Sequence, residues 1–179
     1  MIPLFRAALA VSLDGYIAAK DGTVDWLNDY FTPEIDFGGF MKTIGATVFG
    51  RTTFDEAMAR VRSVGPSGRV FVLTHRPLVN PPKGVEAFSG DVRELAGRLR
   101  SQMAGTGKDI WLMGGGKSID SFREAGLVDR WELGIIPVLL GDGIPLFPRH
   151  SRGLEGLRVT RSRTLGNGIV EAWYVPVRP

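Results

Sequence analysis

The fold of this chain is decided by one stretch of sequence, Ile110-Trp111-Leu112-Met113-Gly114-Gly115-Gly116-Lys117-Ser118. The apolar run at its start predicts a buried strand, and Ile119, Phe122 and Ala125 then share one face of a helix. Glycines at a strand-to-helix turn let the backbone approach a ligand closely, and the N–H groups that open the helix favour a phosphate. A tight turn that binds nothing is the simpler alternative, but three consecutive glycines exceed what a turn requires. The stretch therefore predicts a nucleotide site.

The glycines do not match either of two common nucleotide-binding motifs. A phosphate loop of the NTPase type needs a glycine five residues before Gly116, where this chain has Trp111. The dinucleotide pattern Gly-x-Gly-x-x-Gly needs a glycine three residues after Gly116, where the chain has Ile119. The site must be of another design.

Two further predicted strands end in hydroxyl and arginine side chains. The clusters are Gly50, Arg51, Thr52 and Thr53 after a strand at 47–49, and Thr74, His75, Arg76 and Pro77 after a strand at 70–73. Taken alone, the cluster at 50–53 is explained better by a Thr helix cap beside a surface arginine. Open α/β sheets, however, bind ligands at the carboxyl ends of their strands. Three such clusters after three strands predict one extended, phosphate-bearing ligand.

The remaining patterns indicate an α/β fold. Leu4 to Val11 reads as a strand covered on both faces, and helices are expected from Pro33 to Gly45, over 52–61 and from Asp91 to Gly105. Three more strands are expected at 131–140, 157–165 and 169–177, the last two joined by a hairpin at Asn167-Gly168. The order predicts one domain over residues 1–179, with a mainly parallel sheet, an antiparallel C-terminal edge and helices on both faces.

Composition excludes several classes of protein. The chain has no cysteine and two histidines, His75 and His150, which excludes a disulfide scaffold, a thiol nucleophile and a thiolate metal site, and no metal site is expected. No Gly-x-Ser-x-Gly motif of a serine hydrolase occurs. The longest apolar stretch, Leu133 to Gly141, is too short for a membrane helix, so a cytoplasmic protein is expected.

Net charge is +3, and the excess of basic residues is concentrated in residues 149–179. Such a tail can bind nucleic acid. Solvated arginines at alternating strand positions explain it more simply, so nucleic acid is not the expected partner.

Two acidic residues are candidates for contact with a substrate. Asp36 follows the first strand among Ile35, Phe37 and Phe40, so it can be a carboxylate on an apolar helix face, which would raise its pKa. Asp25, Asp29 and Glu34 compete for this role, and a solvated helix carboxylate is an equally good interpretation. Asp14, before Gly15, is most simply a turn residue beside the predicted site.

Together these motifs resemble the dihydrofolate reductase superfamily, from Ala7-Ala8-Leu9-Ala10-Val11 through the clusters at 48–54, 72–77 and 110–118. Within it the chain looks most like the RibD C-terminal domain family. Two motifs favour that branch, Ser12-Leu13-Asp14-Gly15 and the run from Val138 to Phe147.

The resemblance implies an NADPH-dependent reductase with a sheet of about eight strands, acting as a homodimer. In the family pattern Gly50, Arg51, Thr52 and Thr53 hold the cofactor's pyrophosphate and 2′-phosphate side, and Thr74, His75 and Arg76 lie beside the adenosine 2′-phosphate. Gly114, Gly115, Gly116, Lys117 and Ser118 cradle the pyrophosphate, with a cis bond between Gly114 and Gly115. Ala8 and Ile17 flank the nicotinamide.

The substrate implied is a pyrimidine- or pterin-like small molecule that is reduced at a carbonyl or imine, as in the uracil reductase step of riboflavin biosynthesis. Asp36 and Phe40 reproduce the acid-to-phenylalanine spacing of dihydrofolate reductase, and Asp14 matches an acid that the family uses near a substrate sugar. Alternatives are a true dihydrofolate reductase and a nucleotide-binding protein without catalysis.

Overall fold

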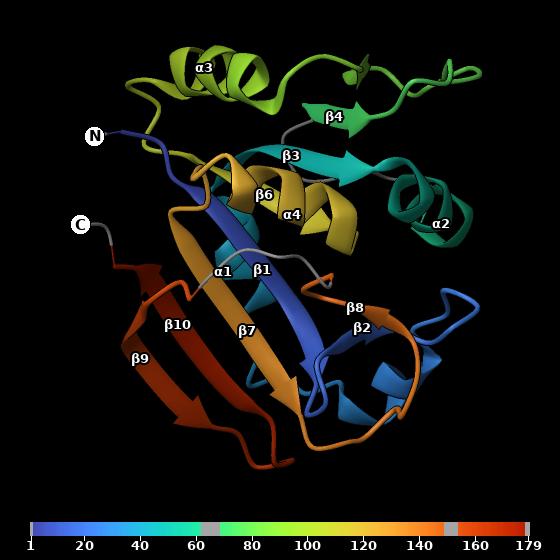
Figure 1. The fold of residues 1–179 in the computed structure, drawn as a ribbon, viewed down its shortest axis with the longest axis vertical. Helices are drawn as coiled ribbons and strands as arrows, with labels where there is room; N and C mark the ends of the chain where they lie inside the picture. Colours follow the sequence, from blue (N-terminus) through green and yellow to red (C-terminus); the bar gives the residue numbers. More distant parts are fainter. Residues whose placement is uncertain (1, 62–68, 149–153, 178–179) are drawn as a thin grey trace.

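The computed structural model describes residues 2–61, 69–148 and 154–177. Its centre is an eight-stranded sheet in the order β5-β4-β3-β6-β1-β7-β10-β9 (Figure 1). The strands are β1 (Phe5–Ser12), β3 (Ile44–Gly50), β4 (Val70–Leu73), β5 (Val85–Phe88), β6 (Asp109–Gly114), β7 (Arg130–Ile136), β9 (Leu157–Thr164) and β10 (Val170–Pro176).

Six neighbouring strands, from β5 to β7, pair in parallel, and β10 runs antiparallel to both β7 and β9. The chain thus has the predicted mainly parallel sheet with an antiparallel C-terminal edge. Because the parallel strands point the same way, β3, β4 and β6 all end at one edge of the sheet.

One face of the sheet is covered by α3 (Val92–Met103) and α4 (Gly116–Glu124). Phe5, Leu112 and Phe122 are buried there, and the Phe5 and Phe122 rings lie 5.3 Å apart. Asp91, where this helix was expected to begin, caps α3, because its carboxylate accepts the Arg93 N–H at 2.8 Å. This face holds the main core.

The other face is covered by α1 (Phe37–Lys42), which lies behind the sheet in Figure 1, and by α2 (Arg51–Val61). Phe54 of α2 packs against Phe49 and Val72 in a second core. A 3-10 helix, η1 (Asp25–Tyr30), packs beside a third cluster around Ile136 and Ile169. Helices therefore lie on both faces of the sheet, as predicted.

Some sequence-based boundaries are wrong, and some strands were missed. The helix expected from Pro33 begins only at Phe37, because the preceding segment instead lies along the C-terminal hairpin, where Gly166 N–H donates to Glu34 at 3.0 Å. The strand expected over 131–140 ends at Ile136, since Pro137 supplies no N–H to continue the ladder. Two short strands, β2 (Tyr16–Ala18) and β8 (Ile144–Pro145), pair as a separate ribbon that was not predicted. Strand β5 was also missed.

No helix in the described ranges is long and apolar enough to cross a membrane.

Candidate functional site

The three predicted clusters meet at one edge of the sheet. Strands β4, β3 and β6 are adjacent, so the residues after Leu73, at Gly50 and after Gly114 follow neighbouring strand ends (Figure 1). This is the carboxyl edge where open α/β sheets bind ligands.

Gly50 lies directly against the glycine turn. A β-carbon at Gly50 would stand 2.4 Å from Ser118 Oγ and 3.3 Å from the backbone nitrogen of Gly115. Real β-carbons essentially never approach another atom so closely, so a larger residue at position 50 would have to displace Ser118 or the turn. The end of β3 and the start of α4 therefore form a single backbone-lined cradle.

The turn itself is made of backbone groups. The Gly114–Gly115 peptide bond is cis, which confirms the expectation, and Gly114 has a φ of 141°. A β-carbon at Gly115 would lie 3.1 Å from Thr53 Oγ1, which places this hydroxyl beside the turn. Gly115 is the N-cap of α4 and offers no side chain to cap it. The first N–H groups of α4 are thus free of a side-chain cap and suited to an anion.

Arg51 connects the cluster at 50–53 with the cluster at 74–77. Its Nε donates to both Asp55 oxygens at 2.9 and 2.8 Å, and its Nη1 donates to the Pro77 carbonyl at 3.1 Å. Thr74 Oγ1 accepts the Arg76 N–H at 3.0 Å, which orders the turn after β4. The side chains of Thr52, His75, Arg76 and Lys117 are all exposed at this edge.

The ribbon of β2 and β8 closes over the start of α4. A β-carbon at Gly116 would stand 2.5 Å from the Pro145 carbonyl oxygen and 3.7 Å from Ile17 Cδ1. The structure thus brings Ile17 to the glycine turn, and its place beside a nicotinamide stays a prediction. The role of the Pro145 backbone was missed, although the run from Val138 to Phe147 was a family motif and so carried the signal.

Asp14 fastens the turn before β2 to the loop that leads into β8. Its carboxylate accepts hydrogen bonds from Ser12 Oγ at 2.6 Å, from Gly141 N at 2.8 Å and from Leu140 N at 3.2 Å. These bonds, that of Ser12 foremost, lower the pKa of Asp14 although desolvation opposes them. The prediction of a turn residue is confirmed, and a contact of Asp14 with substrate stays a prediction.

Asp36 is not on an apolar helix face, so this expectation is wrong. The helix starts one residue later, and the exposed Asp36 is its N-cap, accepting the Gly39 N–H at 2.7 Å. Glycine at position 39 permits this close approach, because a β-carbon there would lie 2.1 Å from Asp36 Oδ2. A contact with substrate remains a prediction for Asp36.

Beside Asp36, the rings of Phe37, Phe40 and Trp111 form an aromatic wall on the face of the sheet opposite the main core. Phe37 is 53% exposed, and its ring lies edge-on to Trp111 at 6.0 Å. Trp111 Nε1 donates to the carbonyl of Ala8 at 2.9 Å. Ala8 lies two residues after Arg6 in β1 and therefore shares its face, where Arg6 lies over the Phe40 ring. Sequence reasoning missed Trp111 because its place in an apolar strand marked it only as core.

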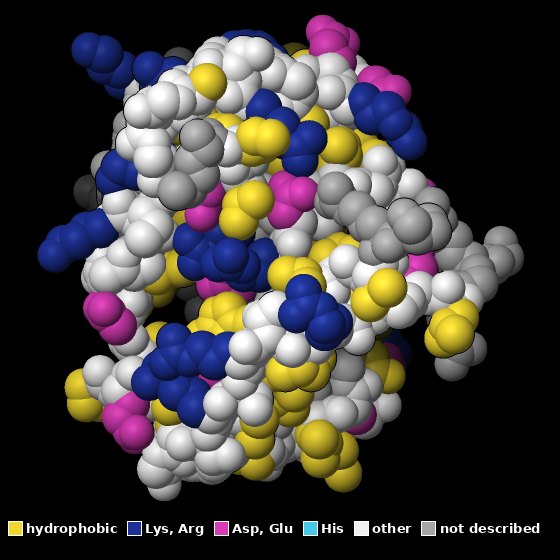
Figure 2. All heavy atoms as spheres, turned by 90° about the vertical axis from the view of Figure 1, so that its left-hand side faces the viewer, with side chains coloured by type: hydrophobic (Ala, Val, Ile, Leu, Met, Phe, Trp, Pro, Cys, Tyr) yellow, Lys and Arg dark blue, Asp and Glu magenta, His cyan; other side chains and the backbone are white. Residues whose placement is uncertain are grey.

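Farther along the same face, Trp173 of β10 pairs in register with Glu132 of β7, which pairs with Ala8 of β1. Arg161 lies over the Trp173 ring at 4.7 Å. Figure 2 shows hydrophobic side chains between groups of Lys and Arg on the side of the molecule that carries β9 and β10. Arg161 and the ion pair of Arg163 with Glu171 agree with the interpretation of the basic tail as a strand face.

In the described part of the chain, no group of three histidine, aspartate or glutamate side chains is placed to hold a metal ion.

This sheet order, with a glycine turn that closes against the neighbouring strand end, defines a dihydrofolate reductase-like α/β domain. The model of the RibD C-terminal domain matches residues 3–171, and the chain belongs to that family.

Known relatives agree with this assignment. The chain is 32% identical over 177 residues to the uncharacterized protein YyaP of Bacillus subtilis, covering 93% of this chain and 91% of YyaP. It is 34% identical over 165 residues to YwjB of the same organism, covering 90% of this chain and 91% of YwjB. Neither relative carries an assigned activity in its name.

Among solved structures, a putative riboflavin biosynthesis protein from Shewanella sp. PV-4 superposes with a TM-score of 0.80 at 27% identity, over 99% of this chain and 100% of that one. A deaminase/5-amino-6-(5-phosphoribosylamino)uracil reductase from Thermotoga maritima superposes with a TM-score of 0.69 at 16% identity. The match covers 98% of this chain and 57% of the Thermotoga chain, and it shows a shared fold.

Proposed function

We propose that the protein is an NADPH-dependent reductase that transfers hydride to a carbonyl or imine of a pyrimidine- or pterin-like small molecule. The observation that carries the proposal is the packing of Gly50 against Gly115 and Ser118 at the carboxyl edge. A backbone cradle beside the uncapped start of α4 suits the pyrophosphate of a dinucleotide.

The residues at this edge fit such a cofactor. Side chains are missing at Gly50, Gly114 and Gly115, where a pyrophosphate needs close backbone approach, and exposed cations lie on either side of them. Arg76 and Arg51 follow neighbouring strand ends and suit the 2′-phosphate, with Thr74 and His75 beside it. Lys117 and the hydroxyls of Thr52, Thr53 and Ser118 suit the phosphates nearer the turn.

When bound, the reduced nicotinamide would supply the hydride, and the protein would orient it and keep water away. Ile17 and the Pro145 backbone cover the start of α4 and would limit access of water from that side. Ala8 lies on the face that carries the aromatic wall, so a nicotinamide between Ile17 and Ala8 would be directed toward that face. The exposed Phe37 ring there suits stacking against a flat heterocycle.

The substrate side is proposed with two acids in different roles. Asp36, exposed next to Phe37, would anchor a polar edge of the ring or supply a proton. Asp14 would act mainly by holding the ribbon that carries Ile17.

Cofactor binding is tested by fluorescence titration of NADPH and NADH. We expect saturable binding of NADPH, weaker binding of NADH and a preference that is lost in Arg76→Ala. Absence of binding, or equal affinity of the wild type for both cofactors, would contradict the proposal.

Catalysis is tested by NADPH oxidation with two substrates, 5-amino-6-(5-phosphoribosylamino)uracil and dihydrofolate. Turnover of the first alone would favour the riboflavin-type reductase, and turnover of the second would favour a dihydrofolate reductase. Tight NADPH binding with no turnover of either would favour another substrate or a non-catalytic nucleotide-binding role. Asp36→Asn is expected to raise KM or lower kcat while leaving NADPH affinity unchanged.

The proposal includes a homodimer. Strand β9 is an edge strand, and Leu157 and Val159 on it are 43% and 53% exposed. Exposed edges of this kind invite pairing with another chain. Light scattering is expected to give twice the 19.5 kDa chain mass, whereas a monomer at micromolar concentration would contradict this part.

A further inference from the structure

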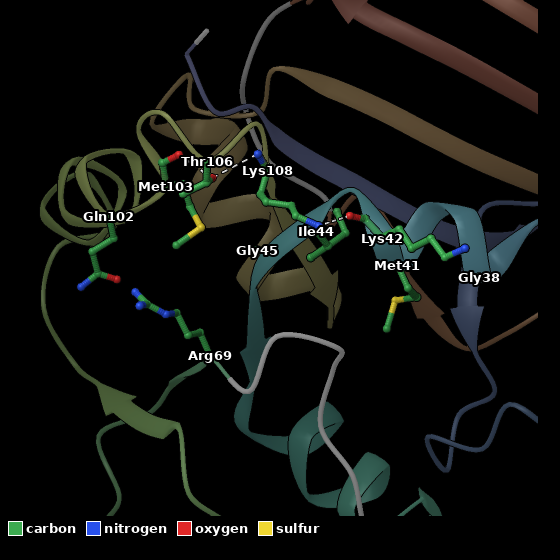
Figure 3. Close-up of a pocket in the computed structure, with 10 residues that line it drawn as sticks. All are labelled: Gly38, Met41, Lys42, Ile44, Gly45, Arg69, Gln102, Met103, Thr106 and Lys108. Atoms are coloured by element: carbon green, nitrogen blue, oxygen red, sulfur yellow. Dashed lines mark hydrogen bonds between the residues drawn. The ribbon is translucent and has the colours of Figure 1, made fainter.

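The molecule has an open depression of about 460 Å³ at the amino ends of the strands, opposite the proposed cofactor edge (Figure 3). Its walls come from the end of α1, the start of β3, the residue before β4, the end of α3 and the turn before β6. The lining residues are Gly38, Met41, Lys42, Ile44, Gly45, Arg69, Gln102, Met103, Thr106 and Lys108. Ligand pockets of small molecules typically have volumes in this range, roughly 300–1,000 Å³.

Among the described residues, the lining is positively charged and contains no acid. Three of the ten residues, Lys42, Arg69 and Lys108, are cations, and none is an aspartate or glutamate. Asp109, next to Lys108 in the sequence, is turned inward: it accepts the Leu4 N–H at 3.0 Å and Arg6 Nη1 at 3.3 Å. Its charge is thus occupied elsewhere, and the depression keeps an excess of positive charge.

Two cationic side chains of the depression have N–H groups with no hydrogen-bond partner among the described residues. The Lys108 ammonium donates one hydrogen bond to the Lys42 carbonyl, which leaves two of its three N–H groups without a partner in the described part of the chain. Arg69 is exposed and forms no ion pair or side-chain hydrogen bond within the described ranges, so its five N–H donors are unused there. Figure 3 shows the Arg69 and Gln102 side chains pointing toward one another across the opening, while the Lys42 ammonium lies at the opposite rim.

The floor of the depression is apolar. Ile44 and Met103 are buried, Met41 is half-buried, and Gly45 lets Met103 and Lys108 close in, because a β-carbon there would stand 2.4 Å from Met103 Sδ. Met side chains adapt their shape to an apolar surface. An occupant with a charged head and a compact apolar body would match both parts of the lining.

We propose that this depression is a second binding site, which takes the phosphate group of a small phosphate monoester with a ring or short apolar body. Arg69 and Gln102 would bind the phosphate, Lys42 and Lys108 would add long-range attraction, and Met41 and Met103 would contact the apolar body. The site lies at the far edge of the sheet from Gly50 and Gly115, so its ligand would not compete with a cofactor there.

The probe is phenyl phosphate, titrated into the ¹⁵N-labelled full chain and followed by the amide signals. We expect saturable shifts at Gly45, Thr106 and Lys108, with no change at Gly50, Gly115 and Lys117. Inorganic phosphate is expected to shift the same amides with at least fivefold weaker affinity, because it lacks the apolar body. Equal affinity for the two would overturn the role of the methionines.

Two exposed variants make the test specific. Arg69→Glu is expected to weaken phenyl phosphate binding at least tenfold. Arg93→Glu, on the exposed start of α3 and outside the depression, changes the net charge equally and should leave the affinity unchanged. Equal affinity in Arg69→Glu and wild type, or no saturation, would overturn the site.

The test also separates this site from the proposed function. Shifts confined to Gly50, Gly115 and Lys117 would show binding at the cofactor edge and overturn the second site. NADPH is expected to bind to Arg69→Glu as tightly as to the wild type. If the wild type does not bind NADPH, that result counts against the reductase proposal and not against the second site.

Discussion

Arg6 of β1 and Glu132 of β7 form a two-point ion pair within the sheet, with Nε–Oε1 at 2.5 Å and Nη2–Oε2 at 2.8 Å. Both side chains are only 10% exposed. Burial alone would lower the pKa of Arg6, but the hydrogen bond and charge of Glu132, aided by Asp109, raise it. Phe40 of α1 stacks on the same guanidinium at 4.7 Å, so the pair ties α1 to the two central strands.

Glu132→Ala is expected to lower the free energy of unfolding by about 3 kcal/mol or more, because it leaves the Arg6 charge buried with only partial compensation. Urea unfolding followed by circular dichroism measures this. The double variant Arg6→Met/Glu132→Leu should regain most of the loss, since two apolar side chains remove the unpaired charge. A single variant as stable as the wild type would show that the ion pair contributes little.

Gly50→Ala is expected to weaken NADPH binding at least tenfold, about 1.4 kcal/mol. The added β-carbon would displace Ser118 and Gly115 from the end of β3. Fluorescence titration measures the affinity. Gly97→Ala in α3 is the matched control, since a β-carbon there meets nothing within 4 Å. Wild-type affinity in a folded Gly50→Ala variant would argue against the cradle as the pyrophosphate site.

Arg76→Ala is expected to weaken NADPH binding about tenfold and to leave NADH binding unchanged, because a charge-assisted bond to the 2′-phosphate is lost. Arg51 is held by Asp55 and Pro77, so Arg51→Ala should weaken both cofactors by also loosening the turn after β4. Arg158→Ala, on the exposed face of β9, is the control. Equal losses of affinity for NADPH and NADH in Arg76→Ala would show that Arg76 does not bind the 2′-phosphate.

Asp14→Asn is expected to destabilise the protein at neutral pH and to have progressively less effect in acid. The pKa of Asp14 is lowered in the folded state, from an ordinary value of 3.8, so folding favours the ionised carboxylate. Its stabilising contribution is full above that value and disappears as the pH falls through the lower, folded pKa. Urea unfolding of both proteins at a series of pH values measures the difference.

The control for this series is Asp29→Asn, because Asp29 is exposed and its carboxylate makes no hydrogen bond in the part of the chain described here. Its stability relative to wild type should not depend on pH in the same way. If the difference in the free energy of unfolding between wild type and Asp14→Asn does not change with pH, the hydrogen bond from Gly141 to residue 14 does not need the negative charge.

The carboxyl-edge site could be predicted because its information is local. Three glycines after an apolar run, and hydroxyl–arginine clusters after two others, mark strand ends, and parallel strands then place those ends together. Asp36 shows the limit of such patterns. Its apolar neighbours suggested a buried helix position, but the Asp36 carboxylate caps the helix through the Gly39 N–H, and the segment before it is held by the distant hairpin.

Long-range contacts account for the other misses. The pairing of β2 with β8 joins Tyr16 to Pro145, and two- or three-residue strands carry no periodicity to detect. Strand β5 has only partly buried or exposed residues, so its pattern was weak. The depression around Arg69 is assembled from five separate segments, none of which has a motif of its own.

The position of β10 between β7 and β9 has a consequence for the order of assembly during synthesis. Strand β9 precedes β10 in the chain, yet among the described strands it pairs only with β10. As the ribosome releases the chain, β9 has no place to dock until the hairpin through Asn167 has turned and β10 has added to β7. Strands β9 and β10, a quarter of the eight-stranded sheet, must therefore form late and as one hairpin, whereas the strands that build the glycine cradle are already available.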